Sequence, residues 1–229
     1  YAYDWGADPY EKDIFLEIDW MPCNVPGEIN KPQQDLINKI VDIFAEQDIN
    51  LHVDLGDMGG GGEIPYCKSN FSFSKLRDLY WTYFLNNKIN NPRKGIFHYG
   101  VICSYCPDLN FPFFGWDSLD SFAISSEWLK EILSFFPIER LIAGAIVHHL
   151  GHTLGLMADT YNGIDNMGTS NLLNRDFWIY KNYKSCMNYR YKYWIFSYSD
   201  GSHGKRDFDD WSNLNFEFFK NTDFKKMDF

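Results

Sequence analysis

The first part of the chain alternates between the patterns of strands and helices. Residues 13–20 and 49–55 are rich in β-branched and aromatic side chains, which is typical of strands, and a glycine run at 59–62 stops the second. Between them, apolar residues in 33–47 recur at the three- and four-residue spacing of an amphipathic helix. A strand, a helix and a strand in this order predict a parallel strand pair joined by a crossover helix.

The same patterns predict two more strands and two more helices. Residues 94–103 and 121–125 are expected to be strands, and 126–136 a helix. A further helix is expected to begin at Pro137, because the first helical turn tolerates a missing N–H group. We expect this helix to end at Gly155, since glycine adopts the left-handed conformation that follows many helices.

The rest of the chain has little periodicity. Residues 157–206 are rich in Asn, Asp, Gly, Ser and Tyr, and 208–219 are expected to form a last helix. No internal repeat or linker interrupts the sequence. We therefore predict an α/β fold with a twisted, mostly parallel sheet in one domain, 1–229, divided into a sheet-and-helix lobe (1–155) and an irregular C-terminal lobe (156–229).

Composition limits the classes of partner. The chain has 229 residues, of which 45% are hydrophobic, so it can bury a sizeable core. A net charge of -10 argues against nucleic acid or a membrane surface as partner, because both attract clustered Lys and Arg. We find no apolar run long enough to cross a bilayer and no signal peptide, and we interpret the chain as a mature fragment.

The five cysteines are compatible with an oxidising compartment, although their odd number leaves at least one outside any internal pair. Cys103 and Cys106 form a single C-x-x-C motif, which is a weak zinc signal without a second pair. A structural bridge with Cys23 or Cys67 is the preferred interpretation. Cys186 lies in an apolar stretch and is expected to be a small buried residue.

The main candidate for chemistry is a pair of histidines on the helix expected before Gly155. His148 and His152 are four residues apart, so one helical face offers both imidazoles to a single ion. Zinc endopeptidase helices have this spacing in H-E-x-x-H, extended in some to H-E-x-x-H-x-x-G-x-x-H. Here His149 stands in place of the glutamate and Ala158 in place of the third histidine.

A second motif strengthens this interpretation. Residues 185–189, Ser-Cys-Met-Asn-Tyr, resemble the Met-turn that supports the metal in the metzincin clan of zinc endopeptidases. With the histidine helix, they make the chain similar to a secreted bacterial and archaeal branch of metzincin-like peptidases. Softer matches to that branch lie at 6–9, 12–21, 51–56, 97–99 and 198–201.

The resemblance implies a two-lobed fold in which three histidines hold zinc and a glutamate on the helix activates the attacking water. It also implies secretion, and a peptide substrate that lies extended along an edge strand. By position, His148 and His152 match the first two zinc ligands. Met187 matches the methionine beneath the metal, and Tyr189 a tyrosine that approaches the metal or the developing oxyanion.

The departures from the pattern leave the third ligand and the base open. Asp159 is the carboxylate nearest to Ala158 but is one residue out of register, and Asp165 and His203 are more distant substitutes. A positioned general base contributes on the order of 10²–10⁴ in rate. His149 offers one acceptor atom where a glutamate has two oxygens.

Three hypotheses follow. The first is a metzincin-type homologue with impaired or lost hydrolysis, which binds zinc weakly or not at all and keeps a peptide-binding groove. The second is an active zinc endopeptidase with His148, His152 and Asp159 as ligands and His149 or another acid as base. The third is that one or both departures were introduced deliberately.

The candidate calcium ligands are Asp207, Asp209 and Asp210. Acidic residues at this spacing are more typical of a hydrated surface.

Overall fold

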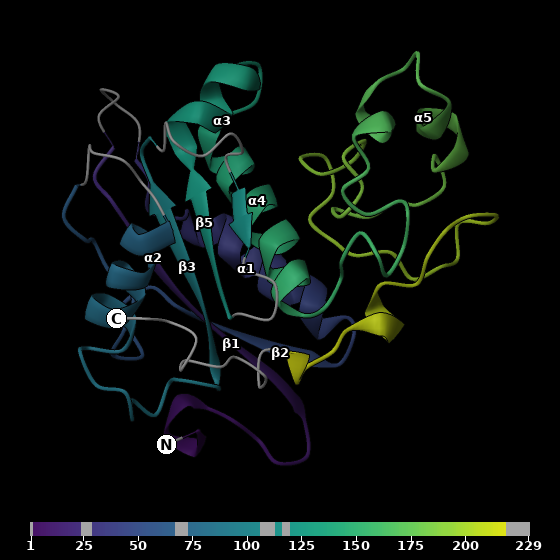
Figure 1. The fold of residues 1–229 in the computed structure, drawn as a ribbon. Coiled ribbons are helices and arrows are strands. Elements are labelled where there is room, and N and C mark those ends of the chain that lie inside the picture. Colours follow the sequence, from purple (N-terminus) through teal and green to yellow (C-terminus); the bar gives the residue numbers. More distant parts are fainter. Residues whose placement is uncertain (1, 24–28, 67–72, 106–112, 116–119, 219–229) are drawn as a thin grey trace.

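The computed structural model describes residues 2–23, 29–66, 73–105, 113–115 and 120–218, and its centre is a sheet in the spatial order β2-β1-β3-β5-β4. Neighbouring strands among β1, β2, β3 and β5 are parallel, and β4 is antiparallel to β5 at one edge (Figure 1). The strands are β1 (Lys12–Trp20), β2 (Ile49–Asp54), β3 (Phe97–Cys103), β4 (Phe113–Gly115) and β5 (Ser121–Ser125).

The central strands are buried on both faces. Every residue of β3 and β5 is buried. A parallel sheet covered by helices on both sides requires apolar residues in a nearly continuous run, and these two strands have that composition. The strands expected from the sequence are present at these positions, and the parallel pairing of β1 with β2 agrees with the predicted crossover.

Helices cover the two faces of the sheet. On one face, α1 (Gln34–Ala45) and α4 (Ile138–Thr153) pack into the larger apolar core, and α1 contributes Ile37, Ile40 and Phe44. On the other face lies α2 (Phe73–Leu79), followed by a π-helical turn, Tyr80–Phe84. Figure 1 shows α1 and α4 together on one side of the strands and α2 on the other.

The glycine run at 59–62 covers buried carboxylates. The Asp54 carboxylate accepts hydrogen bonds from the backbone N–H groups of Gly56, Met58 and Gly60. A Cβ atom at Gly60 would lie 2.3 Å from a carboxylate oxygen of Glu17, so only glycine permits this close approach.

The helix α3 (Ser126–Ile132) is shorter than the expected 126–136. It ends because Leu133 leaves the helical region, with φ -128° and ψ 43°. The chain then turns so that Pro137, which restricts the residue before it, directly precedes α4.

After α4 the chain is mostly irregular, with one short α-helix, α5 (Arg175–Ile179), and short 3-10 turns among the described residues (Figure 1). The helix expected at 208–219 is wrong for the part that is described, where only the 3-10 turn Trp211–Asn213 forms. The Asp209 carboxylate accepts hydrogen bonds from the N–H and the hydroxyl of Ser212, and such local bonds compete with a continuous helix. The division into two lobes stays a prediction.

Two of the cysteines differ in their chemical state. Cys103 is disulfide-bonded, and Cys186 is a buried free thiol.

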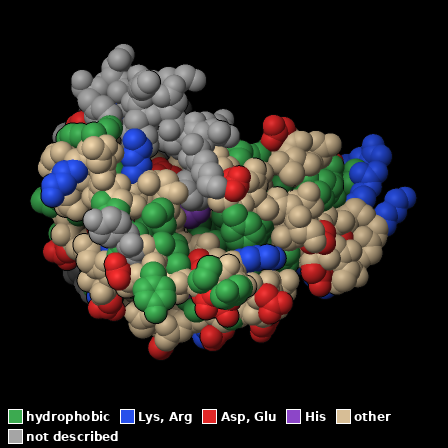
Figure 2. Space-filling model, turned by 90° about the horizontal axis from the view of Figure 1, so that it is seen from below, with side chains coloured by type: hydrophobic (Ala, Val, Ile, Leu, Met, Phe, Trp, Pro, Cys, Tyr) green, Lys and Arg blue, Asp and Glu red, His purple; other side chains and the backbone are tan. Residues whose placement is uncertain are grey.

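None of the described helices has the length and apolarity needed to cross a bilayer. On the face shown in Figure 2, acidic side chains are spread among apolar and polar ones.

Candidate metal site

The helix α4 brings two imidazoles together inside the protein. The Nε2 atoms of His148 and His152 lie 3.1 Å apart, and both side chains are buried. Almost the whole helix is buried, so its histidine face lies against protein. Gly155 follows the helix with a φ of 86°, the left-handed conformation of a glycine that ends a helix.

The segment around Met187 packs against this helix between the two histidines. A Cβ atom at Gly151 would lie 2.6 Å from Met187 Sδ, so the glycine allows the methionine to lie directly on α4. The Nδ1–H group of His148 donates to the backbone carbonyl of Cys186 over 3.0 Å. Ser185 Oγ accepts a hydrogen bond from the N–H of Met187, which closes the turn. The sequence analysis did not identify this close contact at Gly151. A glycine inside a helical pattern was the signal that could have indicated it.

Asp165 adds a carboxylate to the pair. Its Oδ1 is 3.1 Å from Nε2 of His148, and its Oδ2 is 3.1 Å from Nε2 of His152. Its backbone N–H donates to the carbonyl of Met187 over 3.2 Å, and its φ of 51° turns the chain towards the helix. The loop that follows α4 therefore returns to the histidines through the Met187 segment.

The hydrogen bonds of the histidines determine which atoms face the centre. His152 donates its Nδ1–H to the carbonyl of Leu156 over 2.7 Å, as His148 does to Cys186. Each Nε2 therefore presents a lone pair to the other and to the Asp165 carboxylate, which has only acceptor atoms when ionised. Three acceptors at 3.1 Å repel one another unless a cation lies between them.

The donor set fits zinc. Nitrogen or oxygen ligands at 2.0–2.2 Å from a tetrahedral zinc ion lie about 3.3–3.6 Å apart, slightly more than the 3.1 Å here. Both imidazoles are oriented by backbone carbonyls, the usual support for a metal-binding histidine.

The pKa values favour the deprotonated forms that metal binding requires. Burial, aided by the positive charge of Lys192, lowers the pKa of His148 to about 3. Burial alone would raise the pKa of Asp165, but a proton on either imidazole would attract and hydrogen-bond its carboxylate, and this effect outweighs burial and lowers the pKa of Asp165 below its usual range. At neutral pH, His148 and Asp165 therefore need not release protons to bind a metal.

His149 lies at the same site, and its ligand atom is within 4.8 Å of those of His148 and His152. Its ring stacks on Phe122 with the centroids 5.8 Å apart. Burial, with the charge of Lys192, lowers the pKa of His149 well below its usual value. His149 is therefore close enough to take part but is a weak proton acceptor.

Two residues of the following segment also face the histidines. The ring centroid of Tyr189 is 5.9 Å from that of His148, and burial together with the nearby Asp165 carboxylate raises the pKa of its hydroxyl. Lys192 is buried, and burial lowers the pKa of its ammonium group to about 7. Lys192 was missed in the sequence, where the signal was a lysine inside an aromatic stretch.

The other ligand candidates lie elsewhere. Asp159 and Ala158 are exposed in the turn after α4. Of the three substitutes considered for the missing histidine, the structure places Asp165, and not Asp159 or His203, beside His148 and His152.

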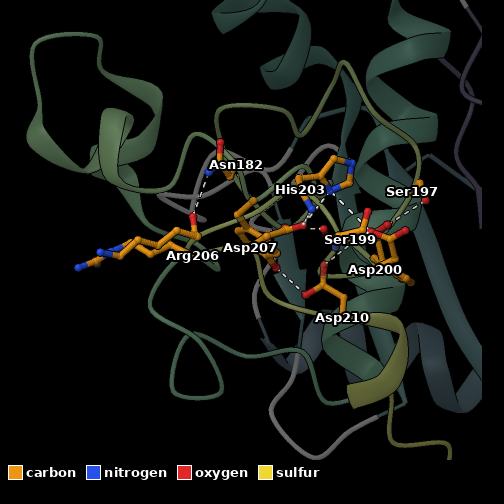
Figure 3. A network of polar contacts seen from close by, with 12 residues as sticks. Asn182, Ser197, Ser199, Asp200, His203, Arg206, Asp207 and Asp210 are labelled. Atoms are coloured by element: carbon orange, nitrogen blue, oxygen red, sulfur yellow. Dashed lines mark hydrogen bonds and ion pairs between the residues drawn. The ribbon is translucent and has the colours of Figure 1, made fainter.

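His203 belongs to a second described group of potential ligands, with Asp200 and Asp207 (Figure 3). The Asp207 carboxylate accepts hydrogen bonds from the N–H and the Nδ1–H of His203, both at 2.8 Å. Its other oxygen accepts from the Ser199 hydroxyl at 2.6 Å. These bonds hold the 200–207 loop closed.

Calcium is not supported at Asp207, Asp209 and Asp210, because the three carboxylates do not share a centre. Asp209 bonds to Ser212, and Asp210 accepts from the hydroxyl of Tyr183 at 2.6 Å. Asp207 and Asp210 both accept hydrogen bonds from Ser199, one from its hydroxyl and the other from its backbone N–H, and Figure 3 shows the two carboxylates near that residue.

Comparisons with known proteins give a distant likeness. No protein-family model matches the chain, and no curated protein does. Among solved structures, the chain is similar to an archaemetzincin from Methanopyrus kandleri, with a TM-score of 0.33 and 16% identity, over 62% of this chain and 74% of that one. It is also similar to an archaemetzincin from Archaeoglobus fulgidus complexed with malonate, with a TM-score of 0.29 and 15% identity, over 62% and 79% of the chains. Similarity at this level carries no argument about function, which rests on the site alone.

Proposed function

We propose that this protein binds zinc through His148, His152 and Asp165, and that it is a metzincin-type peptidase homologue with impaired hydrolysis. The observation that carries the proposal is the convergence of two imidazole lone pairs and one carboxylate at 3.1 Å. A zinc ion bound there would supply a Lewis acid for the carbonyl of a peptide bond.

Impaired hydrolysis follows from His149, which stands at the position that a glutamate base would occupy. His149 is buried there among positive and metal-binding groups, and its lowered pKa makes it a poor acceptor for a proton. The loss of a positioned base costs on the order of 10²–10⁴ in rate. Tyr189 remains beside the ligands and could orient a substrate carbonyl through its hydroxyl.

Peptide binding is proposed along β4. This strand is the last one described on its side of the sheet, and it packs against the site helix α4. The outer edge of such a strand can pair with an extended segment through backbone hydrogen bonds. The Met187 segment is then the counterpart of the Met-turn. The disulfide of Cys103 supports a secreted protein, since such bonds persist in oxidising compartments.

The substitution His149→Glu tests the proposal. Because Asp165 already provides a third ligand, this change alone should let the zinc-loaded protein cleave an unstructured, fluorescently labelled protein at least about 100-fold faster than the parent. His149→Gln, which has the same size but no basic group, is the control and should gain nothing.

Two results would count against the proposal. If zinc-loaded His149→Glu gains no activity while zinc analysis shows a full site, the geometry does not support peptide hydrolysis. If the parent already cleaves substrate and chelation stops it, the alternative of an active endopeptidase with an atypical base is correct.

A further inference from the structure

A cavity of about 510 Å³ adjoins the histidine site. It shares two residues with that site, Tyr189 and Lys192, and its other walls come from α3, the turn before α4 and the irregular C-terminal part. Its volume is within the range of about 300–1,000 Å³ that is typical of ligand pockets.

The walls of this cavity are largely aromatic. Phe136 packs against Phe135 with the ring centroids 4.2 Å apart and against Trp194 at 4.8 Å, so this side is already formed. Around the opening, Phe135 is 71% exposed, Met167 68% and Trp194 61%. Large apolar side chains exposed together around a hollow indicate a binding surface.

The charged residues of the cavity all have one sign. Arg190 and Lys192 line it, and none of its described lining residues is acidic, although the whole chain carries a net charge of -10. Arg190 is held in place, because its guanidinium donates to the carbonyl of Phe177 and lies 3.7 Å from the centroid of that ring. The cavity therefore complements a ligand that is both apolar and anionic.

The ammonium group of Lys192 lies where the cavity meets the histidines. Its Nζ is 5.1 Å from the ring centroid of Tyr189 and 5.7 Å from that of Tyr193, and both rings line the cavity. The residue is 2% exposed, so an anion beside it would interact with little screening by water.

We propose that this cavity binds the C-terminal residue of a peptide, with a large apolar side chain between the aromatic walls and the free α-carboxylate at Lys192. A C-terminal residue carries both groups on one Cα atom, whereas an internal Asp or Glu has a carboxylate but no large apolar group. This inference rests on the proposed function for what happens to the peptide, but the binding itself needs no metal.

The test is fluorescence anisotropy of labelled peptides with the full chain, freed of metal by a chelator. A peptide that ends in Phe with a free carboxylate should bind at least about tenfold more tightly than the same peptide with a C-terminal amide, because a charge-assisted bond is lost. It should also bind more tightly than a peptide that ends in Gly, which leaves the aromatic walls unfilled.

Two variants separate the parts of the site. Lys192→Met keeps the apolar stem and should abolish the preference for the free carboxylate, whereas the matched control Lys39→Met, at an exposed position on α1, should keep it. Phe135→Ser replaces an exposed side chain, so the fold is kept, and it should weaken the binding of the Phe-terminated peptide while leaving the Gly-terminated one unchanged.

The proposal is overturned if the amide binds as tightly as the acid, or if folded Lys192→Met still prefers the acid. It is also overturned if an aryl-alkanoic acid binds but no peptide does. Zinc binding is measured separately on the protein without peptide, so a failure here is distinct from a failure of the proposed function.

Discussion

At the residue scale, the site depends on hydrogen bonds that leave only acceptors facing inwards. The pairing of His148 with His152 was predictable from their spacing alone. That Asp165 is the carboxylate beside them was not, because it depends on a left-handed residue and on its bond to Met187. Asp159 was preferred because it is the carboxylate nearest to Ala158 in the sequence, and closeness in the sequence does not show how a loop returns to the site.

Replacement of Asp165 should weaken zinc binding. Asp165→Asn removes the one anionic ligand, and we expect the zinc affinity to fall by at least about 100-fold, the upper end of what changes to supporting residues cause. Competition with a chromogenic chelator measures this. Asp159→Asn, at an exposed position, is the control and should bind zinc like the parent. If Asp159→Asn instead lost zinc affinity and Asp165→Asn bound zinc like the parent, Asp159 would be the third ligand.

At the scale of elements, α4 is the scaffold of the site. Its limits, from Pro137 to Gly155, were predictable because both ends carry residues with strong backbone preferences. The short helices α2 and α5 were not, since each is too short to show a periodic pattern. The four parallel strands were predictable because burial leaves long apolar runs in them, whereas the short antiparallel β4 was not predicted.

The contact of α4 with the segment after Met187 should be sensitive to one methyl group. At Gly144, a Cβ atom would lie 2.9 Å from the backbone carbonyl oxygen of Lys192. Alanine favours a helix over glycine by about 1 kcal/mol, but overpacking against backbone costs roughly 1–3 kcal/mol. We expect Gly144→Ala to lower the free energy of unfolding by about 1 kcal/mol in urea denaturation. A more stable variant would show that this segment is not tightly packed on the helix.

At the scale of the whole molecule, the sheet separates the candidate metal site from a second set of buried polar groups. Arg93 pairs there with Glu17 and, at 2.7 Å, with Asp54. Burial raises the pKa of Glu17 to about 7 and that of Asp19 to about 6. This cluster was not predicted, because its members come from three distant segments of the chain and each alone is typical of a surface residue.

Asp120, on the same side, makes stability depend on pH. Burial raises its pKa to about 7, against the opposing hydrogen bond from Tyr80 at 2.7 Å. Between about pH 4 and 7 the folded protein keeps a proton that the unfolded chain has lost, so this contribution to stability declines as the pH rises, by up to about 1.4 kcal/mol per unit. Asp120→Asn removes the contribution.

Urea denaturation at pH 5 and pH 8 checks this. The free energy of unfolding of Asp120→Asn, minus that of the parent, should be larger at pH 8 than at pH 5. The same difference for the exposed control Asp42→Asn should not change with pH. An Asp120→Asn difference that does not vary with pH would mean that the carboxyl is ionised throughout.

The most direct test of the central claim is X-ray absorption at the zinc edge, on the protein loaded with one equivalent of zinc. The structure predicts one bound ion with nitrogen and oxygen ligands at about 2.0–2.2 Å and the scattering of two imidazole rings. Failure to retain zinc, or a sulfur ligand at about 2.3 Å, would contradict the site formed by His148, His152 and Asp165.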